Sequence, residues 1–416
     1  MALLVQKFGG SSVGTIDRIQ KVAANIIKAK QEGHNIVVVV SAMYGETDRL
    51  IQLAHALSSD PNPREYDILV STGEQASMAL LAIALTQNNC SSRSYTGAQA
   101  GILTDNVHTK ARILDVKTDA IRKDLANGHV VVVAGFQGVN EHGETTTLGR
   151  GGSDTTAVAL AAALNADECQ IFTDVDGVYT TDPKMIAEAR LISQISYEEM
   201  LEMASLGAKV LQMRSVEIAS KHNVPLRVLS SFNEGPGTLV TLEEKIMKKR
   251  LVSGIAFSRE EAIISLSGVP NRPGIEGHIL GLISEANIEI DMIAQNATDE
   301  QHTDFTFTMH RGDFPKALKL AEQLALELGA GTIKSTANVA KLSLVGIGMR
   351  SHTGVASTMF KALGNADINI QMITTSEIKI SVIIEEDCLE RGVRAVHQAF
   401  ELDKATSEKF PAHMES

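Results

Sequence analysis

The part of the chain before Glu243 alternates between short apolar runs and longer amphipathic stretches. Runs rich in Val, Ile and Leu predict buried strands at Leu3–Gln6, Ile36–Val40, Val130–Ala134, Gln170–Thr173 and Leu226–Leu229. Helical spacing of apolar positions predicts helices at Asp17–Glu32, Glu74–Gln87, Ala111–Asn127, Thr155–Leu164 and Val210–His222. Apolar strands that alternate with helices are typical of an α/β protein, with a mostly parallel sheet sandwiched by helices.

Beyond this region the pattern changes and the chain repeats itself. A charge-dense stretch that starts at Glu243 predicts a connector over residues 243–260. After it, Ile264–Asn296 aligns with Leu342–Ser376, with a two-residue insertion before Gly354. Each copy continues with a second strand (Asp304–Met309; Ile378–Ile384) and a closing helix (Phe314–Leu328; Cys388–Phe400).

This order predicts two ferredoxin-like (βαββαβ) modules in tandem. The predicted domains are therefore residues 1–242, a connector at 243–260, and modules at 261–338 and 339–416.

Composition and charge narrow the classes of function. The 416 residues are 44% hydrophobic and 21% charged, which excludes disordered and fibrous chains. A net charge of −12 and an aromatic content of 4% offer neither a basic footprint nor stacking surfaces for nucleic acid or an anionic membrane. Small-molecule chemistry is favoured.

The cysteines and the N-terminus bear on the compartment. Cys90, Cys169 and Cys388 lack the spacing of a zinc site or a redox pair, so we expect reduced thiols. No signal-peptide core follows Met1, and no run approaches the ~18 apolar residues of a membrane span. A cytoplasmic protein without a membrane partner is expected.

Two Gly-rich junctions between a strand and a helix are the main candidates for a binding site. Lys7–Gly14 and Leu148–Thr156 each place free backbone N–H groups at a helix N-terminus, which favours an anion. The first junction carries Lys7, and the second carries Arg150 and Asp154, so a polyanion between them is one interpretation. The alternatives are structural turns and, for Asp154, a helix cap.

Further candidates are individually ambiguous. The segment Thr173–Pro183 contains tight Asp-Gly and Asp-Pro turns, which fit either a surface turn or a pocket for a nucleotide base. Glu74 and Lys209 fit either a solvated surface or a site.

Together these motifs resemble the aspartate kinases of the amino acid kinase family. The resemblance rests on KFGGS at Lys7–Ser11, Ser41–Met43, Ser71–Glu74, GRGGSDTT at Gly149–Thr156, TDVDGVYTTDP at Thr173–Pro183, and tandem modules that look like ACT domains. One departure is Met43–Asp48, where the family has a small Gly-rich run. Tyr44 and Glu46 stand there in this chain and leave Thr47 matched.

The resemblance implies transfer of the γ-phosphoryl of ATP to the β-carboxylate of L-aspartate, which gives 4-phospho-L-aspartate and ADP. This would be the first step of lysine, threonine and methionine biosynthesis. A carboxylate with a pKa of about 3.9 is ionised at neutral pH and needs no general base. The protein's task is to align two anions and neutralise charge. Mg²⁺ held mainly by ATP is implied, with no protein metal ligands.

The resemblance also implies roles for individual residues. The catalytic residues would be Lys7, Asp154 and Lys209. ATP would be bound by Lys7, Phe8, Gly9, Gly10, Ser11, Ser41, Thr173, Asp174, Tyr179, Lys184, Lys209 and Val210. Aspartate would be bound by Thr47, Glu74, Arg150, Gly151, Gly152, Ser153 and Asp154. Effectors would be bound by Asn271, Gly274, Asp291, Gln295, Asn296, Thr353, Gly354, Val355, Asn369, Thr375, Ser376 and Glu377.

Feedback inhibition by lysine, threonine or both is implied. So is a homo-oligomer, a dimer or tetramer through ACT pairing, or a complex with a shorter regulatory chain, for which Met247 offers an internal start.

Two alternatives remain at this point. One is another amino acid kinase that acts on N-acetylglutamate, glutamate, carbamate or UMP, although Glu74 and Arg150 would form a clamp for a zwitterion. The other is a non-catalytic amino-acid sensor, against which the joint presence of Lys7, Arg150, Asp154 and Lys209 argues.

Overall fold

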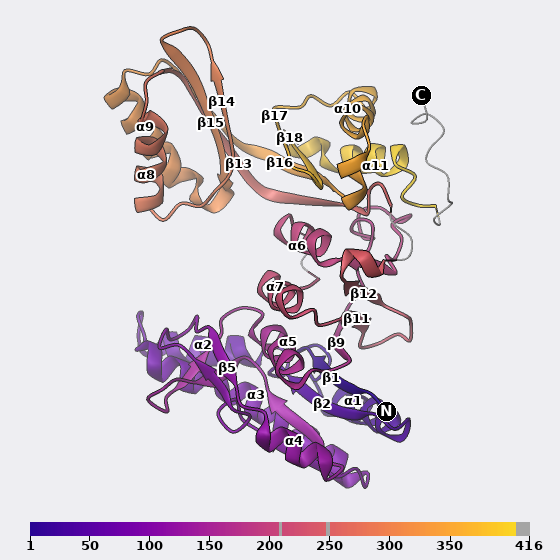
Figure 1. Ribbon diagram of the computed structural model, residues 1–416. Helices are drawn as coiled ribbons and strands as arrows, with labels where there is room; N and C mark the ends of the chain where they lie inside the picture. Colours follow the sequence, from indigo (N-terminus) through magenta and orange to yellow (C-terminus); the bar gives the residue numbers. More distant parts are fainter. Residues whose placement is uncertain (208–209, 247–249, 405–416) are drawn as a thin grey trace. The chain divides into compact units, whose positions relative to one another are not determined.

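The computed structural model describes residues 1–207, 210–246 and 250–404, which form two compact units (Figure 1). The first contains residues 1–179, 191–205 and 210–246, and the second contains residues 180–190, 206–207 and 250–404.

The first unit is an α/β sandwich around an eight-stranded sheet of order β10-β12-β11-β9-β1-β2-β6-β3. The pairs that flank β1 run parallel, and β12 runs antiparallel to β11. Its strands are β1 (Leu3–Phe8), β2 (Asn35–Val40), β3 (Ser92–Tyr95), β6 (Val130–Ala134), β9 (Glu168–Thr173), β10 (Gln194–Ser196), β11 (Leu226–Ser230) and β12 (Thr238–Thr241). Its helices are α1 (Ile16–Gln31), α2 (Glu46–Leu57), α3 (Pro63–Gln87), α4 (Asp119–Ala126), α5 (Gly152–Leu164), α6 (Tyr197–Ser205) and α7 (Met213–His222).

The central strands are apolar throughout because both faces of the sheet are covered. Val38 and Val132 face a core shared with α1 and α3, whereas α5 packs against β1, β2 and β9 and contacts α7. The alternation of buried side chains between two helical layers is the expected property of a central parallel strand.

The helix predicted at Glu74–Gln87 and the one predicted at Ala111–Asn127 differ most from the structure, whereas α7 begins three residues after the predicted Val210. Helix α3 begins at Pro63, well before Glu74, because the Asn62 side chain caps it and accepts the N–H of Arg64 at 3.0 Å. By length and composition α3 could cross a membrane, but it packs against the sheet and buries Asp67 and Glu74. We therefore interpret it as a core helix.

The helix predicted at Ala111–Asn127 is wrong over its first part. Ile113–Val116 is strand β5, which pairs with β4 (Ile102–Thr104), so backbone pairing prevails over the helical spacing of apolar residues. With β7 (Gln137–Val139) and β8 (Thr145–Thr147) these strands form a four-stranded sheet of order β5-β4-β7-β8. Strand β8 leads into the second Gly-rich junction.

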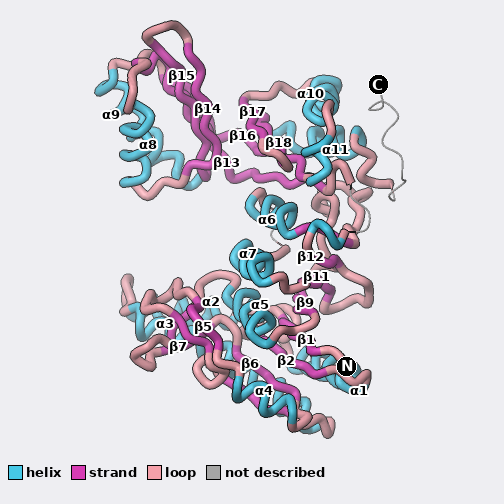
Figure 2. Tube along the Cα trace, viewed as in Figure 1, coloured by secondary structure: helices cyan, strands magenta, loops and turns pink. Residues whose placement is uncertain are grey.

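The second unit contains a six-stranded sheet of order β14-β15-β13-β16-β18-β17. Its strands are β13 (Gly254–Pro270), β14 (Ile290–Ala297), β15 (His302–His310), β16 (Ile333–Val345), β17 (Met372–Thr375) and β18 (Lys379–Glu385). Its helices are α8 (Ile275–Glu285), α9 (Phe314–Leu328), α10 (Val355–Asn365) and α11 (Leu389–Ala399). Figure 2 shows α8 and α9 beside the first repeat's strands, with α10 and α11 beside the second's.

Strands β13 and β16 are shared by the two repeats. The first half of β13 pairs with the second half of β16, from Gly254 opposite Val345 to Ser258 opposite Lys341. Residues 254–260 of the predicted connector are therefore β-structure. The second repeat's part of the sheet includes a strand that precedes the first repeat in the chain.

The segment Thr180–Arg190 also belongs to the second unit, although it follows β9 and the turns of the first. Ile186 is fully buried in the core with α10 and α11. The Thr180 hydroxyl lies 3.0 Å from Nε2 of His397, and the Thr180 carbonyl accepts the N–H of Ile255 at 2.7 Å. The turn that carries Tyr179 is thus continuous with a segment built into the second repeat.

Candidate active site

The carboxyl ends of β1 and β9 meet where the strand order reverses. Strand β2, the next strand along the chain, pairs with one edge of β1. Strand β9, which comes much later in the chain, pairs with the other edge. Ligands of open α/β sheets bind at such a switch point. Lys7 lies near the end of β1, and its Nζ is 2.7 Å from Oδ1 of Asp154, with 11% of each side chain exposed.

Asp154 is held by α5. It lies in the first turn of this helix, whose N-cap residue is Gly151, so Asp154 is not the cap. The two Gly-rich junctions of the sequence are therefore joined by an ion pair between Lys7 and Asp154. The ion pair holds the Lys7 ammonium at the N-terminus of α5. The ammonium and the positive end of the helix dipole together favour the binding of an anion there.

The first Gly-rich loop is tied down at several points. Ser12 Oγ lies 2.6 Å from Oγ of Ser231, and the Arg18 guanidinium donates to the carbonyl of Ser11. At Gly10, a Cβ would stand 3.0 Å from the carbonyl oxygen of Ala42, two residues after the end of β2. The loop therefore keeps a defined shape against the sheet, as a phosphate site requires.

Not every residue predicted in this loop offers its side chain. Phe8 is 1% exposed and stacks on Phe172 with ring centroids 4.6 Å apart, so its side chain is part of the core. The Gly9 N–H donates to the carbonyl of Phe172 at 3.3 Å. Ser41 follows β2, and its N–H donates to the Phe8 carbonyl.

Glu74 is a buried acid that forms no ion pair with any of the described residues. It is 3% exposed, and its Oε1 accepts the N–H of Ala42 at 3.2 Å, whereas Oε2 has no hydrogen-bond partner among the described residues. Burial raises the pKa of Glu74 to about 7. A buried carboxylate of this kind calls for a cationic partner, which a substrate ammonium can supply. Thr47, half-buried in the first turn of α2, follows the same Ala42 loop.

The second Gly-rich loop has room only for glycine at its centre. Gly151 has φ +69°, and a Cβ there would stand 1.9 Å from Cγ of Gln212. Gly152 and Ser153 are buried at the start of α5, against Phe136 and Gly135. Arg150 is exposed beside them.

Replacing Gly151 by alanine is expected to lower kcat/KM of the activity that the sequence implies at least a hundredfold, because the loop or Gln212 must shift to relieve the clash. Steady-state kinetics measures this. Gly143→Ala is the matched control, since Gly143 has φ +77° but open space around its Cβ position. Equal loss of activity in both variants would show that backbone strain, and not the shape of the loop, is responsible.

The predicted nucleotide residues fall into three groups. In the first unit, Thr173 is the last residue of β9 and Asp174 follows it, and Tyr179 directs its hydroxyl to Asp176 at 3.4 Å. Asn233 donates to Asp176 at 3.0 Å and lowers the pKa of that carboxyl. Val210 also belongs to the first unit and is half-buried. By contrast, Lys184 lies in the second unit, and Lys209 lies outside the described residues.

Metal binding by the protein alone has no support in residues 1–207, 210–246 and 250–404, where no group of three or more His, Cys, Asp or Glu could hold an ion. The Lys7 loop and the N-terminus of α5 offer donors for phosphate oxygens. Such a site fits a metal that arrives with the nucleotide.

A hollow of about 460 Å³ lies in the second repeat, between the loop before α10 and the turn after β17. Gly354, Val355, Thr375, Ser376 and Glu377, five of the predicted effector residues, line it together with Met349, Arg350, His352, Ala356 and Ile380. Arg350 Nε lies 3.3 Å from Oε2 of Glu377. Thr353 and Asn369 are not among the residues that line it.

In the first repeat, some predicted effector residues are already engaged. Asp291 pairs with the buried Lys341 at 2.5 Å, and the Gln295 amide donates to Glu276 at 2.8 Å. Asn271 bonds to the carbonyls of Gln301 and Glu300. Gly274 is the N-cap of α8 with φ +94°, and Asn296 is exposed on β14.

Sequence reasoning missed three features: the Ser12–Ser231 contact, the place of Thr180–Arg190, and Asp67. The signal for Asp67 was visible, because a charged residue stands in the apolar stretch Tyr66–Val70. The other two depend on contacts between residues far apart in the chain.

Comparison with known proteins agrees with this geometry. Residues 2–230 match the amino acid kinase family, and residues 262–325 and 342–400 each match an ACT domain. The aspartate kinase of Stutzerimonas stutzeri is 61% identical over 404 residues, which is 97% of this chain and 98% of that protein. The chain belongs to the aspartate kinases of the amino acid kinase family.

Further aspartate kinases are similar to this chain in sequence or in structure. The aspartokinase of Pseudomonas aeruginosa is 60% identical over 405 residues, covering 97% of this chain and 98% of that protein. The solved structure of Escherichia coli aspartokinase III in complex with aspartate and ADP is 26% identical, with a TM-score of 0.78 over 96% of this chain and all of that one. Its complex with lysine and aspartate gives a TM-score of 0.74 at 27% identity. The predicted fold class and family are confirmed.

Proposed function

We propose that this aspartate kinase transfers the γ-phosphoryl of ATP to the β-carboxylate of L-aspartate, giving 4-phospho-L-aspartate and ADP. The observation that carries the proposal is the Lys7–Asp154 pair at the switch point of the sheet, together with the buried Glu74, whose Oε2 lacks a partner among the described residues. The complex of the E. coli relative with aspartate and ADP supports it.

The substrate carboxylate is ionised at neutral pH, so the site needs charge compensation and alignment and no general base. Lys7 would stabilise the migrating phosphoryl, and Asp154 would hold Lys7 in place. Lys209 is proposed as the opposing cation.

For the amino acid, Glu74 would bind the α-ammonium, and the Arg150 guanidinium would bind the α-carboxylate in a fork. Thr47 and Ser153 would supply hydroxyl groups as hydrogen-bond partners of the amino acid. Gly151 and Gly152, which have no side chains, would let the amino acid approach the backbone.

The nucleotide would lie along the loop Gly9–Ser11 and the carboxyl end of β9. Gly10, Ser11 and Ser41 would contact its phosphates. Thr173, Asp174, Tyr179 and Val210 are proposed to surround the rest of the nucleotide, and the role that the resemblance implies for Lys184 stays a prediction. When bound, Mg²⁺ would neutralise phosphate charge and fix the phosphate geometry.

The test is an ADP-release assay with aspartate, compared with glutamate, N-acetylglutamate, carbamate and UMP at equal concentrations. We expect turnover with aspartate to exceed turnover with each alternative at least a hundredfold. A preference for any alternative would overturn the proposal, and the absence of ATP turnover would favour a sensor.

Regulation by lysine, threonine or both is proposed for the hollow in the second repeat. Its lining offers a carboxylate at Glu377, a guanidinium at Arg350, and hydroxyls at Thr375 and Ser376, which suit an amino acid. The lysine complex of E. coli aspartokinase III supports an amino-acid effector. By the same resemblance, the loops at Asn271–Gly274 and around Gln295 remain proposed for a second effector site.

Ser376→Ala is expected to raise the concentration of lysine or threonine for half-inhibition about tenfold, because one hydrogen bond to the effector is lost. Each variant is measured relative to its own uninhibited rate. Lys361→Gln, on the exposed side of α10, is the control and is expected to keep the parental value. Unchanged inhibition of Ser376→Ala would remove the hollow from the proposal.

The assembly and setting are part of the same proposal. We expect a homo-oligomer through ACT pairing, or a complex with a shorter regulatory chain, and a role in lysine, threonine and methionine biosynthesis. Cys90, Cys169 and Cys388 are free thiols, which supports a reducing, cytoplasmic compartment.

A further inference from the structure

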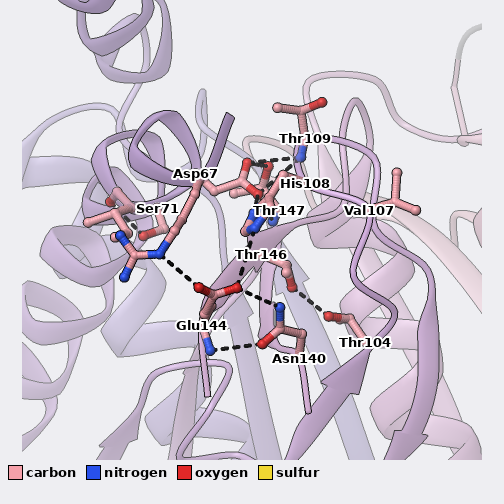
Figure 3. A network of polar contacts seen from close by, with 12 residues as sticks. Asp67, Ser71, Thr104, Val107, His108, Thr109, Asn140, Glu144, Thr146 and Thr147 are labelled. Carbon is pink, nitrogen blue, oxygen red and sulfur yellow. Dashed lines mark hydrogen bonds and ion pairs between the residues drawn. The ribbon is translucent and has the colours of Figure 1, made fainter. Parts of the chain in front are cut away.

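A network of polar contacts surrounds Asp67 in the first unit (Figure 3). Asp67 is fully buried on α3, an otherwise mostly apolar helix of 25 residues. A buried carboxylate is costly unless several donors satisfy it, so its partners show what it holds in place.

The Asp67 carboxylate is surrounded by polar groups from three residues. Thr147 donates its hydroxyl at 2.5 Å and its N–H at 3.2 Å. Thr109 donates its N–H to both oxygens, at 3.1 and 3.0 Å, and His108 Nδ1 lies at 2.8 Å. Asp67 thus fixes two backbone segments, one at the end of β8 and one in the loop before β5.

Both segments support the second Gly-rich loop. Thr147 is three residues before Arg150, and its carbonyl accepts the N–H of Ala111 at 2.9 Å. Thr109 has φ +67°, an unfavourable conformation for a threonine, which the bonds to Asp67 offset. A Cβ added at Gly149 would stand 3.2 Å from the Thr109 carbonyl oxygen, so the Thr109 segment passes close to Gly149. Hydrogen bonds therefore run from Asp67 to Thr147 and Thr109, and the Thr109 segment lies next to Gly149, the residue before Arg150.

The same helix carries Glu74, seven residues after Asp67. Two helical turns separate them, so they lie on the same face of α3, and both are buried. One rigid helix therefore bears the proposed ligand of the substrate ammonium and the anchor of the loop that carries the proposed ligand of its carboxylate.

We propose that Asp67 is a positioning residue that sets the distance between Arg150 and Glu74, and hence the fit of the two α-substituents of aspartate. It touches neither substrate and acts through the loop Thr147–Arg150. This inference rests on the proposed role of Arg150 in binding the α-carboxylate.

The network also provides a matched control. Glu144 lies at its outer edge, where Arg64 Nε donates to it at 2.9 Å and His108 Nε2 lies 3.7 Å away. Glu144 does not contact the segment Thr147–Arg150 in any of these interactions. Glu144→Gln therefore perturbs the same network without releasing the loop.

The experiment compares Asp67→Asn, Glu144→Gln and Arg150→Ala in the full chain. The Asp67→Asn substitution places an NH₂ group against N–H donors, so it is expected to raise KM for aspartate about tenfold. KM for ATP and kcat are expected to change less than about threefold. Glu144→Gln is expected to stay within about twofold of the parent in all three constants.

Two further measurements separate positioning from general damage. In the Arg150→Ala background, Asp67→Asn is expected to add little to KM for aspartate, because residues that act through one another are not additive. Thr147→Val, which removes only the hydroxyl contact, is expected to give a smaller rise of the same kind and serves if Asp67→Asn does not fold.

The outcomes are distinguishable. A large effect of Arg150→Ala with none from Asp67→Asn or Thr147→Val would overturn this inference and leave the proposed function intact. Equal rises in KM for ATP and for aspartate, or full additivity with Arg150→Ala, would also overturn it. No effect of Arg150→Ala would overturn the proposed role of Arg150, and the inference with it.

Discussion

Replacing Lys7 with methionine is expected to lower kcat about a thousandfold, with much smaller changes in the KM values for ATP and aspartate. The Lys7 ammonium lies at the end of β1, 2.7 Å from Asp154 and at the N-terminus of α5. Removing one preorganised donor to the charge that develops in the transition state lowers kcat by a factor of about 10²–10³. The rate of phosphoryl transfer depends strongly on such donors because catalysis of this reaction is mainly positioning and charge stabilisation.

The design must separate catalysis from folding, since Lys7→Met leaves the buried Asp154 without its partner. The paired variant Lys7→Met/Asp154→Asn removes both charges and is expected to recover stability in thermal melts without recovering activity. Lys21→Met, on the exposed side of α1, is the control and is expected to behave as the parent. Recovery of activity in the paired variant would contradict a catalytic role for Lys7.

Replacing Glu74 with glutamine is expected to raise KM for aspartate about a hundredfold, because a charge-assisted bond to the ammonium in a buried site is lost. The same variant is expected to be more stable than the parent at pH 8. Burial raises the pKa of Glu74 from 4.5 to about 7, so ionising it in the folded state costs about 3 kcal/mol relative to the unfolded chain.

The sign of the pH dependence follows from this shift. The folded state binds the Glu74 proton more tightly than the unfolded chain, so the contribution of this group to stability falls as pH rises from about 4.5 to about 7. The gain in melting temperature of Glu74→Gln is therefore expected at pH 8 and is expected to shrink toward pH 5. A gain of the same size at both pH values would contradict the assignment.

Aspartate binding depends on pH in the opposite sense. Only the ionised Glu74 attracts the ammonium, so the parent's KM for aspartate is expected to be about tenfold higher at pH 6 than at pH 8. Glu74→Gln is expected to lose this dependence, and Glu65→Gln, exposed on the same helix, is expected to retain it.

Local patterns were sufficient where the outcome depends on local physics. The apolar runs at Ile36–Val40 and Val130–Ala134 became central strands because only a sheet covered on both faces accommodates them. Helix Phe314–Leu328 has the predicted boundaries, since Pro315 and Gly329 mark its ends. The helix predicted at Ala111–Asn127 failed because pairing with β4 is a contact between segments that no local window contains.

The site divides in the same way. Residue types and Gly-rich spacing indicated Lys7, Glu74 and Asp154, because cations, acids and close backbone approach are properties of the residues themselves. The sequence could not show that Lys7 pairs with Asp154, that Glu74 lacks a cation among the described residues, or that Lys184 belongs to the second unit. Each of these depends on which distant segments meet.

By itself, then, the sequence determined the family, the α/β class and the tandem repeat, since these are encoded in motifs and periodicity along the chain. The tertiary structure alone decided that β13 and β16 are shared between the repeats and that Asp67 holds the loop before Arg150. Pairing register and burial arise from the whole chain. Register and burial determine where the side chains of the candidate site lie and which of them are buried, whereas the sequence shows only which residue types are present.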